Sequence, residues 1–470
     1  MKDLRITLGW LADSLGAVKR GAGLDRLDDQ LIAGISTDSR TLKRGEIFVA
    51  LAGANFDGHN HAAEAQLKGA LAVVAHQPLS GAAAQVALTV TDTLKALGDL
   101  ARALRRKQQL RVTALTGSNG KTTTKEMLAS ILRQADDKLL ATRGNFNNLV
   151  GLPLTLLQMG RQTRQAVLEM GMNRFGEIAR LTAIAEPEVA LITSVGAAHL
   201  EFLGDIRQVA RAKGELFSGL GPAAVAVVDA DQPLILKEAR RFKGSKLLFG
   251  IGPSAQVRLG PIRSRGLDGQ TLALYGPGAE KGRLVKLQLL GEHNAHNALA
   301  AGAAALAAGA DWDQIVAGLE KVEKFPGRLA VVKTPKLMLL DDSYNANPTS
   351  MAAGLRFLGG LKGRGAKGAI LGDMGELGRD QNSYHRAVGR LAAQMELDFL
   401  ALVGPLSAST ALGARRGGLP RAAVAEFATP EEAAEWVART GRPGSTVLVK
   451  GSRYMHLERA VDYLRNLPTY

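Results

Sequence analysis

The loop from Gly117 to Thr123 combines residue types that can bind the phosphates of a nucleoside triphosphate. It follows an apolar run, Val112 to Leu115, and precedes apolar residues at helical spacing, which predicts a strand, a glycine loop and a helix. Glycines let backbone N–H groups turn toward a phosphate chain, and the helix N-terminus adds partial positive charge. In this pattern Lys121 reaches the terminal phosphates and the Thr122 hydroxyl holds Mg²⁺. The general pattern has glycine at position 115, where this chain has leucine, so a glycine turn with a chance Lys-Thr pair is the weaker alternative.

Two further polar residues stand where predicted strands end, the edge at which open α/β sheets bind ligands. Glu169 follows the apolar run Ala166 to Leu168, and His199 follows the run Val189 to Val195 and a short Gly-Ala-Ala stretch. Each residue alone is better explained as a solvated loop residue. Together with the phosphate loop at the same edge they favour a functional site, because Mg²⁺ on a triphosphate needs oxygen ligands and groups that steer the anion.

Lys213 falls on the apolar stripe of a helix predicted from Ile206 to Leu220, whose apolar positions recur at spacings of three and four. A buried ammonium without compensation is costly. Such a lysine is therefore expected to pair, lose its proton, be modified, or extend its amine to the rim. Periodicity alone slightly favours the last of these.

Composition narrows the class of protein. The chain has 470 residues, enough for about two to four domains of roughly 100 to 200 residues each. It contains no cysteine, which excludes disulfides, thiolate metal sites and a cysteine nucleophile. The N-terminus lacks a signal-peptide pattern and no run approaches the ~18 apolar residues of a membrane helix. We therefore expect a cytoplasmic protein without membrane insertion.

The formal net charge of +15 fits either a nucleic-acid partner or small polyanionic substrates. The basic residues are scattered, with the strongest cluster at Arg105, Arg106 and Lys107, and only 4% of residues are aromatic. Few aromatic side chains are therefore available to stack on nucleic-acid bases, so polyanionic substrates are favoured over nucleic acid. A solvated basic surface without a partner is an equally open explanation of the charge.

Apolar runs and turns predict an α/β protein of three domains. A small α/β domain spans residues 1–90, where short apolar runs alternate with turns. A central domain, residues 91–326, alternates helices with buried parallel strands and carries the phosphate loop. After Phe325-Pro326-Gly327, residues 327–470 repeat the alternation and predict a Rossmann-like domain. The Ala/Gly-rich segment from Ala298 to Ala310 is predicted to be a closely packed helix.

The motifs of this chain resemble, in order, those of the Mur ligases over nearly its whole length. The matching segments are Gly117–Thr122, Glu169–Gly171, the His199 loop, Ala212–Glu215, His293–Asn297, Phe325–Arg328 and Asp342–Pro348. The short phosphate loop is the family's own form. Three more segments look like those of the members that add D-alanyl-D-alanine to UDP-N-acetylmuramoyl-tripeptide: Asp38–Arg40, Leu371–Gly378 and Val449–Arg453. The Asp-Asn-Pro-Arg signature of the diaminopimelate-adding members is absent, which lowers that alternative.

The resemblance implies an ATP-dependent amide ligase of peptidoglycan precursor synthesis that forms ADP and phosphate. ATP must activate the tripeptide carboxylate, because a free carboxylate repels an amine and would have to expel oxide. The γ-phosphoryl group would give an acyl phosphate, which the amine of D-alanyl-D-alanine attacks, and the tetrahedral intermediate would expel phosphate. Both steps gather negative charge, so positioned cations are expected to dominate catalysis.

The resemblance also implies residue roles. Thr122 and Glu169 would bind Mg²⁺, and His199 would help bind a second Mg²⁺. Lys213 would be carbamylated, so that a carboxylate-like oxygen replaces the buried amine as a metal ligand. The expected ATP contacts are Gly117, Ser118, Asn119, Gly120, Lys121, Thr122, Thr123, Asn297, Arg328 and Asp342, with Asn297 and Arg328 at adenine and phosphate and Asp342 on the ribose side. Ser39 and Arg40, with the turn Asp57-Gly58-His59, would lie near the uridine nucleotide.

The expected partners are UDP-N-acetylmuramoyl-tripeptide in the first domain and D-alanyl-D-alanine in the third, with a monomer as the default state. Three alternatives stay open. A sibling Mur ligase would add another amino acid. A ligase similar to folylpolyglutamate synthetase would share the fold and the ATP site but does not predict the segment Asp342–Asn347. A nucleic-acid-dependent ATPase suits the charge and the phosphate loop but leaves Lys213 unexplained.

Overall fold

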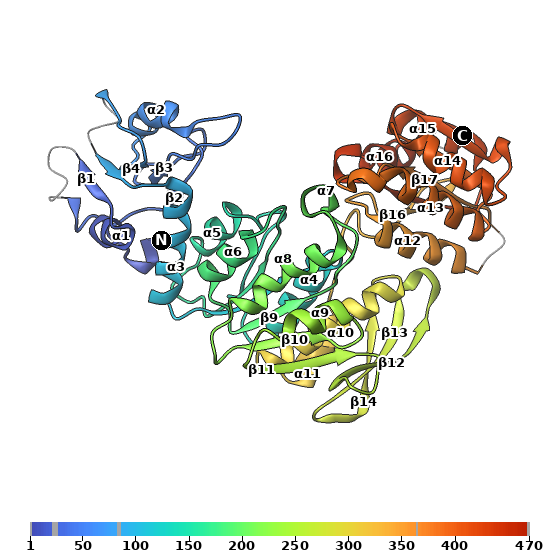
Figure 1. The fold of residues 1–470 in the computed structure, drawn as a ribbon, viewed down its shortest axis with the longest axis horizontal. Helices are drawn as coiled ribbons and strands as arrows, with labels where there is room; N and C mark the ends of the chain where they lie inside the picture. Colours follow the sequence, from blue (N-terminus) through green and yellow to red (C-terminus); the bar gives the residue numbers. More distant parts are fainter. Residues whose placement is uncertain (1, 21–26, 82–85, 363–364, 468–470) are drawn as a thin grey trace.

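The computed structural model describes residues 2–20, 27–81, 86–362 and 365–467. The chain forms three successive α/β domains, each built on one sheet, and they follow one another from the N-terminus to the C-terminus (Figure 1). This arrangement confirms the predicted α/β class. Among the described residues, no helix is both long and apolar enough to cross a membrane.

The N-terminal domain contains a small five-stranded sheet of order β1-β5-β4-β3-β2, in which only the β1–β5 pair is antiparallel. Its strands are β1 (Val18–Arg20), β2 (Ile35–Ser36), β3 (Ile47–Val49), β4 (Ala72–Ala75) and β5 (Ala87–Thr89). Its helices are α1 (Leu8–Leu15) and α2 (Ala62–Leu67), with short 3₁₀ turns η1 (Lys2–Leu4) and η3 (Gly58–His61). The short apolar runs that predicted β3, β4 and β5 are buried in the sheet.

Helix α3 (Thr93–Lys107) leads from this sheet into the central domain and packs against α1 on one side and α5 and α6 on the other. Arg102 and Arg106 both hydrogen-bond the Glu186 carboxylate. Arg105 pairs with Glu188. Two of the three residues of the strongest basic cluster, Arg105 and Arg106, are therefore paired with carboxylates, although Arg106 is 57% exposed.

The central domain is built on a nine-stranded sheet of order β14-β13-β12-β11-β10-β9-β6-β8-β7. Its strands are β6 (Arg111–Thr116), β7 (Leu140–Ala141), β8 (Gln165–Glu169), β9 (Val189–Ile192), β10 (Val225–Asp229), β11 (Ser245–Gly250), β12 (Val257–Ser264), β13 (Gln270–Gly276) and β14 (Ala279–Leu287). Its helices are α4 (Lys121–Leu132), α5 (Gly151–Leu156), α6 (Glu177–Ala185), α7 (Leu200–Leu203), α8 (Ile206–Ser218), α9 (Pro233–Ala239), α10 (Glu292–Ala307) and α11 (Trp312–Glu320).

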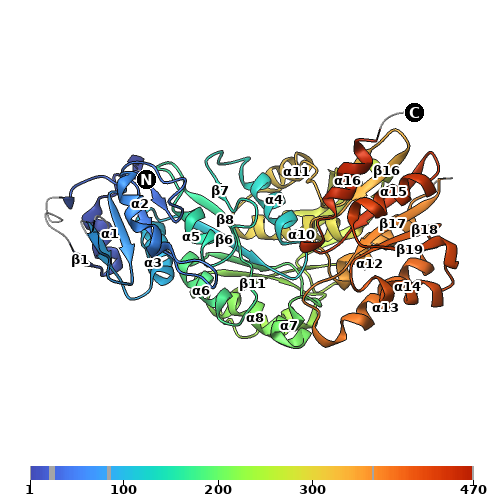
Figure 2. The same cartoon turned by 90° about the horizontal axis from the view of Figure 1, so that it is seen from above.

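Strands β7 to β12 of this sheet run parallel, as the buried apolar runs predicted, and the last two strands add an antiparallel extension. Sequence patterning did not predict the strands β12 to β14. Strands β12 and β14 are half exposed and interrupted by polar residues, whereas β13 is mostly buried. Seen from above, α4 and α11 lie on one side of the central sheet and α6 and α8 on the other (Figure 2). The Ala/Gly-rich segment is part of α10, which is almost fully buried, so the prediction of a closely packed helix is confirmed.

The C-terminal domain has a six-stranded sheet of order β15-β16-β20-β17-β18-β19, parallel except for β15. Its strands are β15 (Ala330–Lys333), β16 (Leu337–Asp341), β17 (Lys367–Gly372), β18 (Phe399–Val403), β19 (Val424–Phe427) and β20 (Ser445–Lys450). Its helices are α12 (Pro348–Gly360), α13 (Gln381–Gln394), α14 (Ser407–Arg416), α15 (Pro430–Thr440) and α16 (Glu458–Arg465). Short 3₁₀ turns complete the described helices: η5 (Gly266–Asp268) in the central domain, and η6 (Gly378–Asp380), η7 (Arg421–Ala423) and η8 (Arg453–Met455) here.

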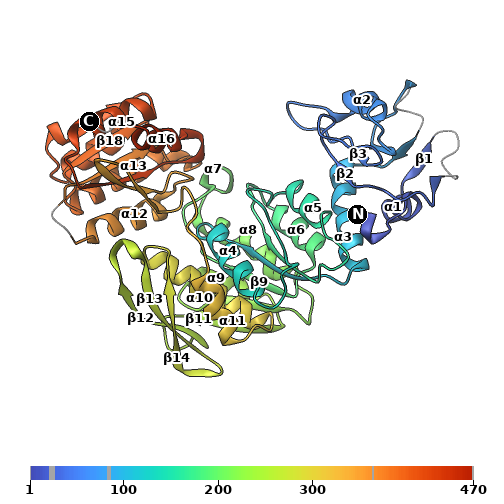
Figure 3. The ribbon, with the colours of Figure 1, turned by 180° about the vertical axis from the view of Figure 1, so that it is seen from behind.

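Two apolar layers cover the faces of the C-terminal sheet, one packed with α12, α13 and α14 and the other with α15 and α16. This is the doubly wound arrangement expected of a Rossmann-like domain. Helix α7 of the central domain reaches this domain and contacts η6 (Figures 1 and 3). The carboxyl ends of strands from both domains therefore face a common region.

Candidate active site

A cleft of about 280 Å³ lies between the phosphate loop of the central domain and the C-terminal domain. The central domain contributes Ser118, Asn119, Gly120, Lys121, Thr122, Thr123, Asn147, Glu169, His293, Asn294 and Asn297 to its walls. The C-terminal side contributes Gly327, Arg328, Asp342, Tyr344, Asn345, Ala346, Asn347, Thr349, Ser350, Ala353 and Lys450. Most residues predicted to contact ATP are thus brought to one place from distant parts of the chain.

The phosphate loop has the predicted local structure, between the end of β6 and the first residue of α4. Gly120 caps the helix in the left-handed region, at φ 78°, and a Cβ atom there would lie only 2.2 Å from Asn297 Oδ1. Lys121 donates from Nζ to the Gly117 carbonyl oxygen at 2.8 Å, which folds its side chain over the loop. Burial lowers the pKa of Lys121, although the nearby Glu169 carboxylate opposes that shift.

Glu169 is the last residue of β8 and is only 2% exposed, so it is not a solvated residue beyond the strand. Its two carboxylate oxygens accept hydrogen bonds of 2.8 Å, one from the Thr122 hydroxyl and one from Asn147 Nδ2. Its backbone N–H donates to Thr142 Oγ1 at 3.0 Å. The carboxylate is therefore held in one orientation beside the phosphate loop.

His199 precedes α7 and adopts a left-handed backbone, at φ 57°. It does not line the cleft. Its Nδ1 lies 2.6 Å from Oε2 of Glu376, a residue of the C-terminal domain that is also left-handed, at φ 59°. The hydrogen bond with His199 lowers the pKa of Glu376. The histidine therefore joins the two domains in this structure.

Lys213 points inward from α8, as its helical position predicted, and is only 1% exposed. The alternative that its amine extends to the rim is therefore wrong. No hydrogen bond or ion pair joins its amine to any of the residues that the structure describes. Burial lowers its pKa well below the ordinary lysine value, and the positive charge of nearby Lys121 adds to this effect.

The C-terminal wall of the cleft is fixed by its own polar contacts. Asp342, expected on the ribose side of ATP, accepts a hydrogen bond of 2.7 Å from Lys450 Nζ. The Arg328 guanidinium lies 4.4 Å from the centre of the Tyr344 ring. One direct hydrogen bond crosses the cleft, from Asn347 Nδ2 to Asn119 Oδ1 of the phosphate loop at 2.7 Å.

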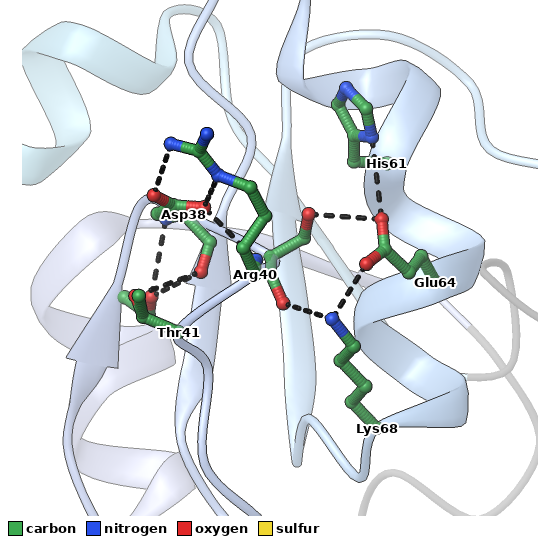
Figure 4. Close-up of polar contacts among 8 residues, drawn as sticks. Asp38, Arg40, Thr41, His61, Glu64 and Lys68 are labelled. Carbon is green, nitrogen blue, oxygen red and sulfur yellow. Dashed lines mark hydrogen bonds and ion pairs between the residues drawn. The ribbon is translucent and has the colours of Figure 1, made fainter.

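Ser39 and Arg40 lie on the N-terminal domain, outside the cleft, where they belong to a separate polar cluster (Figure 4). Arg40 is 84% exposed and makes two side-chain hydrogen bonds to Asp38, which lower the pKa of Asp38 to about 2. The Ser39 hydroxyl donates to Glu64 at 3.0 Å, and Lys68 bridges Glu64 and the Ser39 carbonyl oxygen. The turn at Asp57-Gly58-His59 is also ordered locally, because Asp57 accepts from the His59 backbone N–H.

Thus the structure gathers ten predicted residues around the cleft: Ser118, Asn119, Gly120, Lys121, Thr122, Thr123, Glu169, Asn297, Arg328 and Asp342. Gly117, His199, Lys213, Ser39 and Arg40 do not line it. Sequence reasoning assigned no role to Asn147, Lys450 or Glu376. Asn147 follows a strand of only two residues, too short to register as an apolar run, and the other two take partners that are remote in sequence.

Comparisons with known proteins cover almost the whole chain. Residues 31–105 match the catalytic domain of the Mur ligase family, residues 115–305 the Mur ligase middle domain, and residues 327–453 the Mur ligase glutamate ligase domain. The chain is 37% identical over 470 residues to the UDP-N-acetylmuramoyl-tripeptide–D-alanyl-D-alanine ligase of Escherichia coli strain K12, covering 98% of this chain and 99% of that one.

Solved structures agree with this similarity. A crystal structure of MurF from Acinetobacter baumannii superposes with a TM-score of 0.87 at 34% identity, covering 97% of this chain and 98% of that chain. A crystal structure of the MurF ligase of Thermotoga maritima in complex with ADP superposes with a TM-score of 0.82 at 28% identity, covering 92% and 97%.

Proposed function

Because this chain belongs to the Mur ligase family, we propose that it is the ATP-dependent ligase that joins D-alanyl-D-alanine to UDP-N-acetylmuramoyl-tripeptide. The single observation that carries this function is the similarity to relatives with that activity over nearly the full length of both chains. The cleft supports it, since it combines a phosphate loop with polar groups from a second domain. We place the reaction in the cytoplasm, where ATP is available, as a step of peptidoglycan precursor synthesis.

The residues of the cleft suit transfer of the γ-phosphoryl group from ATP to the tripeptide carboxylate. Lys121 and Arg328 bring positive charge to the phosphates, and the backbone of the glycine loop supplies N–H donors. The acyl phosphate that forms is attacked by the amine of D-alanyl-D-alanine. The tetrahedral intermediate then loses phosphate and a proton to leave the amide. We assign Asn297 to the adenine and Asp342, oriented by Lys450, to the ribose.

Mg²⁺ fits the pair formed by the Thr122 hydroxyl and the Glu169 carboxylate. Both are oxygen donors, they lie 2.8 Å apart, and Mg²⁺ on a nucleotide takes its remaining ligands from phosphates and water. This agrees with the finding that no three His, Asp or Glu side chains converge on a metal-sized site within the described part of the chain. When bound, Mg²⁺ would neutralise charge on the transferring phosphoryl group.

A second Mg²⁺ requires a further oxygen ligand, which we assign to a carbamylated Lys213 with His199 as its partner. The amine of Lys213 is buried and its pKa is depressed, so it favours the neutral form that reacts with CO₂. That reaction joins the amine nitrogen to the carbon of CO₂, releases one proton and leaves a carboxylate-like group. His199 would have to exchange Glu376 for the metal.

We further propose that the three domains divide the substrates among residues 1–90, 91–326 and 327–470. The first would bind the UDP precursor through Ser39 and Arg40, the second ATP, and the third D-alanyl-D-alanine. Support for the first assignment comes from the exposed Arg40, whose guanidinium is presented on the surface by Asp38 (Figure 4). We expect the enzyme to act as a monomer.

Phosphate release by the purified chain tests the function directly. With ATP, Mg²⁺ and UDP-N-acetylmuramoyl-tripeptide, we expect release when D-alanyl-D-alanine is added but not when diaminopimelate, glutamate with a folate, or DNA is added. Release that depends on diaminopimelate would indicate a sibling ligase. Release that depends on DNA alone would contradict the ligase function.

A further inference from the structure

Glu376 is an acidic side chain that the C-terminal domain presents to the phosphate-loop side of the interface. It follows β17 and precedes η6. Its carboxylate reaches His199 Nδ1 at 2.6 Å, and its backbone carbonyl oxygen accepts from the Glu201 N–H at 3.0 Å. Glu376 does not itself line the cleft, but its carboxylate and the Lys121 amine act on each other electrostatically.

The backbone at this contact is strained on both sides. Glu376 and His199 have φ of 59° and 57°, in the left-handed region that disfavours a residue with a Cβ atom. Strain of this kind persists where the surrounding structure holds a side chain in a required direction, and it clusters at functional sites. Glycine would relieve the strain but would remove the carboxylate.

The other carboxylates at this edge of the C-terminal sheet are used inside their own domain. Asp341 accepts from the Gly327 N–H, Asp342 from Lys450 Nζ, and the buried Asp373 from the Leu406 N–H. Glu376 differs from them, because its side chain is 43% exposed and its ion-pair partner belongs to the central domain. Among these four carboxylates, Glu376 can therefore bind a ligand without breaking a hydrogen bond inside the C-terminal domain.

The cleft contains the cations Lys121, Arg328 and Lys450, while its carboxylates Glu169 and Asp342 already have hydrogen-bond partners. A dipeptide brings an ammonium group at neutral pH, and like charges within a few ångströms disfavour its approach. A carboxylate of the C-terminal domain that has no partner within that domain would offset this repulsion as the dipeptide enters. In this structure the Glu376 carboxylate forms an ion pair at 2.6 Å with His199 Nδ1 of the central domain.

We propose that Glu376 binds the ammonium group of the incoming dipeptide and directs its nitrogen toward the activated carboxyl carbon. The ammonium group loses one proton to water before the free amine attacks. This role rests on the proposed ligase function and specifies which residue recognises the amine. His199 and the ammonium group would use the same carboxylate in turn, so that release of His199 accompanies entry of the dipeptide. The competing explanation is that Glu376 only joins the two domains.

The test compares Glu376→Gln, which keeps the shape but removes the charge, with the wild-type enzyme. We expect KM for D-alanyl-D-alanine to rise at least ~10-fold, the loss typical of a hydrogen bond to a charged group, while KM for ATP and UDP-tripeptide stays unchanged. The matched control is Glu396→Gln, because Glu396 is an exposed glutamate of the same domain with a left-handed backbone, at φ 53°, that precedes β18 at the opposite edge of the sheet.

A second measurement separates ammonium recognition from domain joining. Binding of D-alanyl-D-alanine and of its N-acetyl derivative, which has no ammonium group, is measured by calorimetry in the presence of UDP-tripeptide and a non-hydrolysable ATP analogue. We expect acetylation to weaken binding at least ~10-fold in the wild type and to have little effect in Glu376→Gln. Equal sensitivity to acetylation in both proteins would overturn the proposal, as would a rise in KM for ATP alone.

Formation of the acyl phosphate without dipeptide tests the ligase function separately from the proposed role of Glu376. With ATP, UDP-tripeptide and hydroxylamine, the wild type and Glu376→Gln should form the trapped hydroxamate at similar rates. A wild-type enzyme that forms none would contradict the ligase function itself. A loss confined to Glu376→Gln would show that this carboxylate serves phosphoryl transfer, and the ammonium role would be wrong.

Discussion

Two lysines of the candidate active site, Lys121 and Lys213, differ in their surroundings, and burial changes the protonation state that each one favours. Lys121 lies on the loop that would hold the phosphates, and Lys213 is enclosed in α8 with no hydrogen-bond or ion-pair partner among the residues described. The same side-chain type is thus expected to act as a cation in one place and as a neutral amine in the other, because the two sites differ in access to counter-charges.

Replacing Lys121 with alanine tests the first of these roles. The change removes the positive charge expected to follow the γ-phosphoryl group into the transition state, so kcat should fall by well over ~10-fold, each factor of ten being about 1.4 kcal/mol of barrier. The thermal midpoint should be almost unchanged. Steady-state kinetics and a melting curve suffice, and near-normal turnover would refute the role.

Replacing Lys213 with alanine tests whether this lysine acts as a carbamylated metal ligand. If the lysine is carbamylated, Lys213→Ala should be nearly inactive but partly rescued by formate or acetate, whose oxygens could replace the missing ligand. Lys237→Ala, at the end of neighbouring α9, serves as a control that should need no rescue. A ¹³C signal from enzyme equilibrated with ¹³CO₂ gives a readout independent of activity, and its absence in active wild-type enzyme would contradict carbamylation.

The pH dependence of this modification has a definite sign. Burial depresses the pKa of Lys213, so the neutral amine gains population as pH rises through that lowered pKa and is lost as pH falls below it. Activity should therefore decline in acidic buffer depleted of CO₂ and recover on adding bicarbonate at constant pH. An enzyme indifferent to CO₂ under these conditions would speak against the assignment.

At the scale of elements, the phosphate loop depends on close contact between α4 and α10. Gly120→Ala would force a Cβ atom to within 2.2 Å of Asn297 Oδ1 in a left-handed backbone, so we expect lower thermal stability and much weaker ATP binding. Gly144→Ala is a suitable control, because Gly144 is also left-handed but has open space around it. Adding Asn297→Ser should recover stability in part, since it relieves the contact but not the backbone strain. Thermal shifts with and without ATP report both effects.

Helix α3 is held to the central domain by ion pairs whose strength depends on pH. Burial alone would raise the pKa of Glu186, but hydrogen bonds from Arg106 and Arg102 outweigh it and the net pKa is lowered. A carboxyl group with a lowered folded pKa stabilises the protein above its unfolded pKa, about 4.5, and loses that contribution as pH falls. Glu186→Gln should therefore reduce stability at pH 7 more than at pH 4.

Urea unfolding at the two pH values measures this difference. Glu323→Gln, a change at an exposed carboxyl group of the central domain, is the control and should lower stability little at either pH. An equal loss at pH 7 and pH 4 in Glu186→Gln would indicate that the side chain matters for packing rather than charge.

The whole molecule combines sites from separate domains, and their relative position decides which groups meet. The contacts Asn347–Asn119 and His199–Glu376 hold the C-terminal domain against the phosphate-loop edge of the central sheet. The cluster of Ser39 and Arg40 belongs to the first domain and does not line the cleft. Figure 1 shows that the first and third domains lie at opposite ends of the molecule. One long substrate reaching from the first domain to the cleft would connect these regions.

A domain exchange tests this division of labour. If residues 327–470 are replaced by the corresponding domain of a ligase that adds another amino acid, the accepted amine should change while binding of the UDP precursor persists. Product analysis identifies the amine, and calorimetry with the UDP precursor provides the control. A chimera that still prefers D-alanyl-D-alanine would place amine recognition outside the third domain.

Local sequence patterns determined the features that depend on neighbouring residues alone. The strand, loop and helix around Lys121, the inward position of Lys213 and the parallel strands of two domains all follow from periodicity and glycine placement, and the structure confirms them. The half-exposed strands β12 and β14 and the two-residue strand β7 were missed, because none of them forms an apolar run that a short window can recognise.

Only the tertiary structure decided which polar groups pair with each other. His199 and Glu376, Asp342 and Lys450, and Asn119 and Asn347 are distant in sequence and meet because separate strands and domains bring their ends together. Charge and hydrogen bonding act over a few ångströms, so a residue's role depends on neighbours that the linear order does not reveal. The sequence by itself determined that this chain carries a phosphate loop and a lysine on the inward face of a helix. Folding decided that the amine of this lysine is buried and which side chains meet between the domains.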